Sequence, residues 1–258
     1  MNLFGRLIVR NLLTTYDLKP ALFASLVIPS LMYVFFAAFA YDRIIPPFLV
    51  NGVELDYPSF LVPGVVLMHV VTLSSLGGAM FWTDKHNGML EQLLTLPVPR
   101  SYYFLSRMAA ILISSIVSGL AILLLSMPLI AGSIRLEYYS AGLFLISITA
   151  CCLIFAFLSI IIFSFVTTPD HITVFSRLLT TPLIVVSSVF YPLEYAPPLI
   201  QQVGYLNPLT YCADVLRASL LGTFREADIV ACLLLVLLSV VVVVLARVIF
   251  DRKQLESA

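Results

Sequence analysis

Long apolar runs recur along the chain. Nearly uncharged stretches occupy residues 21–41, 59–82, 108–132, 141–166, 178–193 and 229–250. A helix needs about 20 apolar residues to cross a hydrocarbon core of ~30 Å, because each residue rises only ~1.5 Å. The runs are continuous rather than alternating with polar residues, which favours helices over the strands of a transmembrane barrel. We therefore expect an all-α, polytopic membrane protein with six transmembrane helices.

Residues 1–20, before the first run, have a helical pattern of their own. A helix would place two sets of side chains on opposite sides, Asn2, Arg6, Arg10 and Thr14 against Phe4, Ile8 and Leu12. This pattern predicts an amphipathic interface helix lying along the membrane surface. A simple extension of the first span is the alternative, because Leu3 and Leu13 fall toward the polar stripe.

The polar segment 83–107 separates the second and third runs. Within it, Leu90, Leu93 and Leu94 fall on one helical face, whereas Glu91 points elsewhere, and two prolines then stop the helix. A short amphipathic helix at the membrane surface is expected. From the residues alone, packing of this helix on the spans is as good an interpretation as contact with a partner.

Residues 190–222, before the last run, are too apolar and proline-rich for a solvated loop. Asn207 suits an N-cap, Pro208 the first helical position and Gly222 the C-terminal stop, which predicts a helix over residues 208–221. A re-entrant helical hairpin that enters the membrane partway from the outer side fits this composition, since irregular backbone at that depth must be shielded by protein.

Asp214 and Arg217 lie three positions apart on this predicted helix and could pair at its surface. We favour an ordinary solvated helix face for them over a substrate gate, because such surface pairs contribute less than ~1 kcal/mol.

Two kinds of residue inside the runs invite a role. His69 sits near the middle of the second run, where an ionisable side chain is costly and marks a possible translocation path. A neutral histidine also serves as an interhelical hydrogen bonder, which is the interpretation we favour. Gly77, Gly78 and Gly119 are expected to permit close helix packing.

Composition and charge exclude several classes of function. Apolar residues make up 61% of the chain and charged residues 11%, against about 25% charged in a soluble domain. The formal net charge is zero, which gives no basic surface for nucleic acid. The four cysteines show no metal-ligand spacing, so no metal site is predicted. The sequence has no Gly-x-x-x-x-Gly-Lys-Ser/Thr run, so the chain cannot hydrolyse ATP through such a loop.

Lysines and arginines favour one orientation. If the N-terminus is cytoplasmic, the outer segments hold Arg43, Arg135, Arg217 and Arg225, and the other basic residues lie inside. The positive-inside rule then predicts that both termini are cytoplasmic.

Two stretches carry a family resemblance. The first is Gly88-x-Leu90-Glu91-x-Leu93-Leu94-x-x-Pro97, and the second comprises Phe190-Tyr-Pro-Leu-Glu194, Asn207-Pro-Leu-Thr-Tyr211 and Arg217. Together they resemble the ABC-2 type transporter permease family, within which the daunorubicin-resistance and nodulation-factor export permeases are most similar. The resemblance covers nearly the whole chain.

The resemblance implies a single transmembrane domain over residues 1–258, in the cytoplasmic (inner) membrane of a prokaryote. It also implies a homodimer that binds two copies of a separate ATPase, on which ATP and Mg would bind. Segment 83–107 would hold the coupling helix, with ATPase contacts at Asp84, Lys85, Gly88, Leu90, Glu91 and Leu94. The outer re-entrant motif would comprise Phe190, Tyr191, Pro192, Glu194, Asn207, Pro208, Thr210, Tyr211 and Arg217.

We therefore expect a transport subunit, not an enzyme, that exports a lipid, a lipid-linked glycan or a drug-like molecule. An intramembrane lipid-modifying enzyme is one alternative, but the sequence shows no clear Asp, His, Ser or Glu cluster at the membrane boundary. A secondary transporter is another, but no clear internal repeat is visible.

Overall fold

The computed structural model describes residues 3–16, 20–41, 43–89, 100–135, 137–163, 166 and 168–255. Its helices and strands, in chain order, are α1 (Leu3–Tyr16), α2 (Pro20–Phe36), η1 (Ala37–Tyr41), β1 (Phe48–Val50), β2 (Val53–Leu55), α3 (Tyr57–His86), α5 (Arg100–Ile130), α6 (Ser140–Phe163), α7 (Pro169–Val186), η2 (Leu193–Tyr195), α8 (Pro198–Leu206), α9 (Pro208–Leu221) and α10 (Glu226–Leu255).

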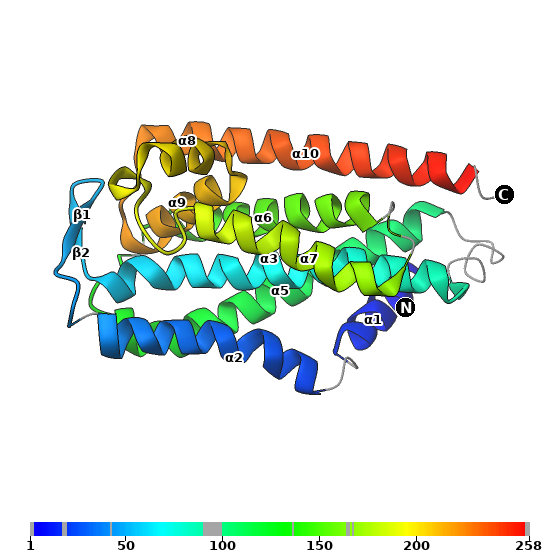
Figure 1. Cartoon of the computed structure of the whole chain (residues 1–258), viewed down its shortest axis with the longest axis horizontal. Helices are drawn as coiled ribbons and strands as arrows, with labels where there is room; N and C mark the ends of the chain where they lie inside the picture. The colour runs from blue at the N-terminus through cyan, green and yellow to red at the C-terminus, as the bar shows by residue number, and fades with distance from the viewer. Residues whose placement is uncertain are drawn as a thin grey trace.

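The long helices form one elongated bundle. Figure 1 shows the β1–β2 hairpin at one end of it, with α1 and the C-terminal end of α10 toward the other. Within the ranges that the structure describes, four helices are long and apolar enough to cross a membrane, namely Tyr57–Asp84, Tyr102–Ile130, Ser140–Phe163 and Glu226–Val248. They correspond to four of the six predicted spans. The first and fifth spans stay predictions.

The fifth predicted span differs from the helix found there. The apolar run covers residues 178–193, whereas α7 covers Pro169–Val186. The helix ends because the backbone N–H of Ser187 turns back to the Ile184 carbonyl at 3.4 Å and its hydroxyl donates to the same oxygen at 2.7 Å. The run's C-terminal part is therefore not helical.

Helix α3 lies in the core and packs against α2, α5, α6, α7 and α9. Glycines allow two close approaches to α3, one by α6 and one by the segment after α7. A Cβ on Gly78 would lie 2.6 Å from the backbone carbonyl carbon of Ser159 in α6, and one on Gly64 would lie 2.4 Å from the Val189 carbonyl oxygen. The predicted packing role of Gly78 is confirmed.

A small hairpin adds β-structure that the all-α prediction missed. Strands β1 and β2 are antiparallel, with Val50 paired to Val53. Asn51 and Gly52 between them have φ values of 56° and 82°. Two consecutive residues with positive φ suit a two-residue hairpin turn, for which Asn-Gly is the favoured sequence. The strands are three residues each, too short for a reliable alternating pattern.

Candidate functional site

Helix α9 positions the candidate site at the hairpin end of the bundle. It covers Pro208–Leu221, as predicted, with the Asn207 side chain accepting a hydrogen bond from the Leu209 N–H. Gly222 ends it in the left-handed conformation, at φ 65°. The cap at one end and the glycine at the other confirm the predicted helix.

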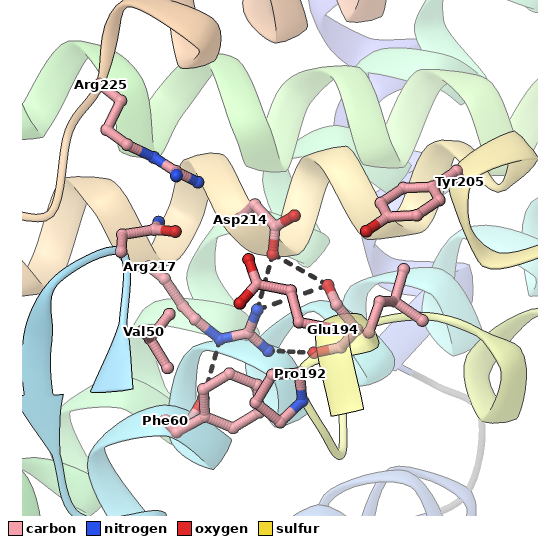
Figure 2. Close-up of a pocket in the computed structure, with 11 residues that line it drawn as sticks. Val50, Phe60, Pro192, Glu194, Tyr205, Asp214, Arg217 and Arg225 are labelled. Carbon is pink, nitrogen blue, oxygen red and sulfur yellow. Dashed lines mark hydrogen bonds and ion pairs between the residues drawn. The ribbon is translucent and has the colours of Figure 1, made fainter. Parts of the chain in front are cut away.

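Arg217 of α9 is the centre of the site. Its Nε donates to the Phe60 carbonyl at 3.0 Å, and its guanidinium carbon lies 3.8 Å from the centre of the Phe60 ring. Its Nη1 donates to Asp214 Oδ1 at 2.8 Å, and its Nη2 donates to the Ser188 carbonyl. Figure 2 shows these bonds reaching α3, α9 and the segment after α7 from a single side chain. Arg217 thus ties three parts of the fold together.

The pairing of Asp214 with Arg217 was predicted, but its setting was not. A solvated helix face is wrong for Arg217, whose side chain is only 3% exposed, whereas the Asp214 side chain is 43% exposed. Burial lowers the pKa of Arg217 to about 10, against the opposing effect of Asp214, so the guanidinium still carries its charge at neutral pH. The buried charge is stabilised by its hydrogen bonds.

Other residues of the outer motif hold the α7–α8–α9 segment in shape. The Asn207 amide donates to the Leu183 carbonyl at 2.6 Å, the Thr210 hydroxyl to the Gly204 carbonyl at 2.8 Å, and the Tyr211 hydroxyl to the Tyr205 carbonyl at 2.7 Å. Tyr191 donates to the Val185 carbonyl at 2.8 Å. Each of these hydrogen bonds is accepted by a backbone carbonyl in the last turn of a helix, where the helix itself leaves carbonyls unpaired.

The remaining motif residues divide between scaffold and pocket. The Phe190 carbonyl accepts from the Tyr57 hydroxyl at 3.2 Å, and Pro208 occupies the start of α9. Pro192 and Glu194 line a pocket of about 200 Å³, together with Arg217 and other residues of the hairpin, α8 and the turn before α10. We call this the outer pocket.

A second polar cluster lies near the opposite end of α3. Asp84 Oδ2 accepts from the Tyr103 hydroxyl at 2.6 Å and from Arg107 Nη2 at 3.0 Å. Arg107 Nη1 donates to Asn11 of α1 at 3.3 Å, and Arg10 Nη2 lies 3.9 Å from Asp84 Oδ1. We call Arg10, Asn11, Asp84, Tyr103 and Arg107 the inner cluster. It joins α1, α3 and α5.

The structure places only some of the expected ATPase-contact residues. Asp84 belongs to the inner cluster, Lys85 lies on α3, and Gly88 follows α3 with φ 68°. Leu90, Glu91 and Leu94 lie outside the described residues. Sequence reasoning missed Tyr103 and Arg107. Their position in the sequence could have identified both residues. Polar residues at the end of an apolar run must find partners once the run is in the membrane.

His69 is buried in α3, at 2% exposure, and does not line the outer pocket. Its role in a translocation path stays a prediction. Within the described residues, no group of three or more His, Cys, Asp or Glu side chains is arranged to hold a metal ion.

Both a protein family and individual known proteins are similar to this chain. The family described as "ABC-2 type transporter" matches residues 2–221. The "Inner membrane transport permease YadH" of Escherichia coli (strain K12) is 25% identical over 168 residues, which is 65% of this chain and 64% of the relative. The chain thus spans less than two thirds of that relative's length.

Two further relatives come from other sources. "Putative transport permease ycf38" of Pyropia yezoensis is 28% identical over 214 residues, which is 82% of this chain and 71% of the relative. "Nodulation protein J" of Neorhizobium galegae is 24% identical over 176 residues, covering 67% of this chain and 64% of the relative.

Proposed function

The chain belongs to the ABC-2 type transporter family, and on this premise we propose that it is the membrane-spanning subunit of an ATP-driven exporter. In this proposal two copies of the chain bind two copies of a separate ATPase, which supplies ATP hydrolysis. The substrate is hydrophobic or amphiphilic, such as a lipid, a lipid-linked glycan or a drug-like molecule, and leaves outward across the cytoplasmic membrane. One relative is named as an inner membrane transport permease, which supports this location.

The inner cluster is the observation that carries the proposal. It joins three helices, and two of its residues, Asp84 and Tyr103, flank residues 90–99 in the sequence, part of the segment that the family resemblance assigns to the ATPase contact. Asp84 is shared by Tyr103 and Arg107 at hydrogen-bond distance. A buried ion pair with several hydrogen bonds costs about 3–5 kcal/mol to break by removing one partner. A displacement of the segment after α3 would therefore move α1, α3 and α5 together.

The rest of the bundle suits such a movement. The described part of α10 presents a mostly apolar outer surface, as a helix facing lipid requires. Helix α3 contacts both the inner cluster and the Arg217 site, through Asp84 and the Phe60 carbonyl. In our proposal α3 carries the ATPase-driven displacement from one end of the bundle to the other.

Glu91 gives the direct test. Glu91→Lys should lower co-purification of the ATPase or the substrate-stimulated hydrolysis by up to about a hundredfold, because a reversed charge at a partly buried contact costs ~1–3 kcal/mol. Glu137→Lys is the matched control, since Glu137 is an exposed carboxylate in the loop between α5 and α6.

Membrane abundance should stay normal for both variants. The measurement compares ATPase co-purification and hydrolysis at equal amounts of permease. Normal docking and normal stimulation in Glu91→Lys would remove the role assigned to that residue. A purified chain that moved substrate down an ion gradient without any ATPase would remove the exporter proposal itself.

A further inference from the structure

The outer pocket contains two charged side chains of opposite sign that form no salt bridge within the described residues. Glu194 of η2 and Arg225 of the turn before α10 both line it. Figure 2 shows the carboxylate and the guanidinium pointing into the pocket from these two elements. Among the described residues, neither side chain forms a salt bridge, whereas Asp214 is already bound to Arg217 at 2.8 Å. The pocket therefore presents one site for a cation and one for an anion.

The position of the pocket matches the depth of lipid head groups. Phe60 lies in the first turn of α3, and Arg225 directly precedes α10. Both helices are long and apolar enough to cross the membrane, and the pocket lies where they end. Charged and polar groups of lipids occupy this level, above the hydrocarbon core.

An apolar groove lies further along α10. It has a volume of about 330 Å³ and is lined by Leu206, Pro208, Tyr211, Leu234, Leu238 and Val241, among other residues. Leu234 comes eight positions after Glu226, so at ~1.5 Å per residue it lies ~12 Å deeper in the membrane. Tyr205 lines the outer pocket and Leu206 the groove, so both features reach the end of α8.

We propose that the outer pocket and this groove together bind one phospholipid whose head group carries a phosphate and a primary ammonium, that is, a phosphatidylethanolamine. Arg225 binds the phosphate, because a guanidinium offers paired donors to phosphate oxygens. Glu194 accepts hydrogen bonds from the ammonium group. An acyl chain occupies the groove, whose wall on α10 is made of leucine and valine side chains.

Charge complementarity argues for this head group over an anionic one. A phosphatidylglycerol would satisfy Arg225 but would leave the Glu194 carboxylate without a cation. The proposal does not depend on an ATPase or on transport, because binding can be measured on the purified chain alone. Its failure and that of the exporter proposal are therefore separate results.

The test uses the full chain in detergent, with lipid occupancy measured by native mass spectrometry. The probes are dioleoyl phosphatidylethanolamine and dioleoyl phosphatidylglycerol. The wild type should prefer the first. Glu194→Gln should bind phosphatidylethanolamine about tenfold more weakly with little change for phosphatidylglycerol, and Arg225→Gln should weaken both about tenfold.

Matched controls separate this effect from general surface charge. Glu137→Gln and Arg43→Gln neutralise exposed side chains that do not line the pocket, and both should bind lipid like the wild type. Val241→Trp fills the groove and should weaken lipid binding, whereas Val230→Trp, on an exposed part of α10, should not. Circular dichroism confirms the helical fold of each variant.

Three results would overturn the proposal. The first is equal binding of the two lipids by the wild type, and the second is Glu194→Gln behaving like Glu137→Gln. The third is full competition by soluble phosphoethanolamine at the lipid's own concentration, together with normal lipid binding by Val241→Trp, which would identify a free zwitterion as the ligand.

Discussion

Buried charged side chains in this fold are each stabilised by several hydrogen-bond partners. Arg217 donates to backbone carbonyls of two other segments while it pairs with Asp214. Asp84 accepts from a hydroxyl and a guanidinium at once. Removing an ion from water costs several kcal/mol, and good geometry with additional hydrogen bonds offsets that cost. A residue with so many partners fixes the positions of the segments that it joins.

Arg217→Lys should therefore destabilise the protein although it keeps the charge. An ammonium cannot donate in the planar fork that reaches Phe60, Ser188 and Asp214 together. We expect a loss of about 2–4 kcal/mol in the free energy of unfolding, because carbonyls and a carboxylate lose their donor. The measurement is the fraction of protein that remains monodisperse after heating in detergent.

Arg43→Lys is the control for this change. Arg43 is exposed and its side chain makes no salt bridge among the described residues, so the same substitution should change stability by less than ~0.5 kcal/mol. Equal heat sensitivity of the two variants would show that the contacts of Arg217 contribute little.

Helix α3 depends on small residues where it meets α6. The backbone N–H of Gly78 donates to the Ser159 hydroxyl at 3.2 Å, an approach that only a residue without a side chain allows. Small residues at helix contacts allow this packing in membranes, where water provides no hydrophobic force between helices. Gly119 differs, because a Cβ there would meet its neighbours at 3.5 Å or more. Helices therefore pack around Gly119, as predicted, but this packing leaves room for a Cβ.

Gly78→Ala and Gly119→Ala make a matched pair within the spans. Gly78→Ala should lower the free energy of unfolding by about 1–3 kcal/mol, since its Cβ would collide with the backbone of α6. The second should be neutral or stabilising by up to ~1 kcal/mol, because alanine has the higher helix propensity. Thermal unfolding of both variants decides the matter, and an equal effect in the two would contradict the close contact of α3 with α6.

At the scale of the whole molecule, the hairpin and the inner cluster lie at opposite ends of the bundle (Figure 1). With the predicted orientation, Asn51→Cys should react with an impermeant maleimide in intact cells, and Asn87→Cys only after the membrane is opened. The background lacks Cys151, Cys152, Cys212 and Cys232, the cysteines of this chain. Labelling in the reverse order would overturn the orientation and place both termini outside.

Much of the architecture follows from the sequence because local rules decide it. Long apolar runs need only their own length and backbone hydrogen bonds to form spanning helices, and within the described residues four of them form helices long and apolar enough to cross a membrane. The α9 helix was predicted to its end residues, since Asn207, Pro208 and Gly222 act within one turn of the helix. The end of α7 was not predicted correctly. The apolar residues continue past Ser187, whereas the helix ends at Val186.

Tertiary structure decided where the charged residues lie. Sequence spacing placed Asp214 near Arg217, but burial of Arg217 depends on Phe60, which is 157 positions away in the chain. The inner cluster likewise joins Asn11 to Arg107, which are 96 positions apart. Such contacts carry no periodic signal, because partners on different helices are brought together only when the helices pack. The sequence by itself determined the membrane class and the family, and the packing of the helices decided which polar residues form sites.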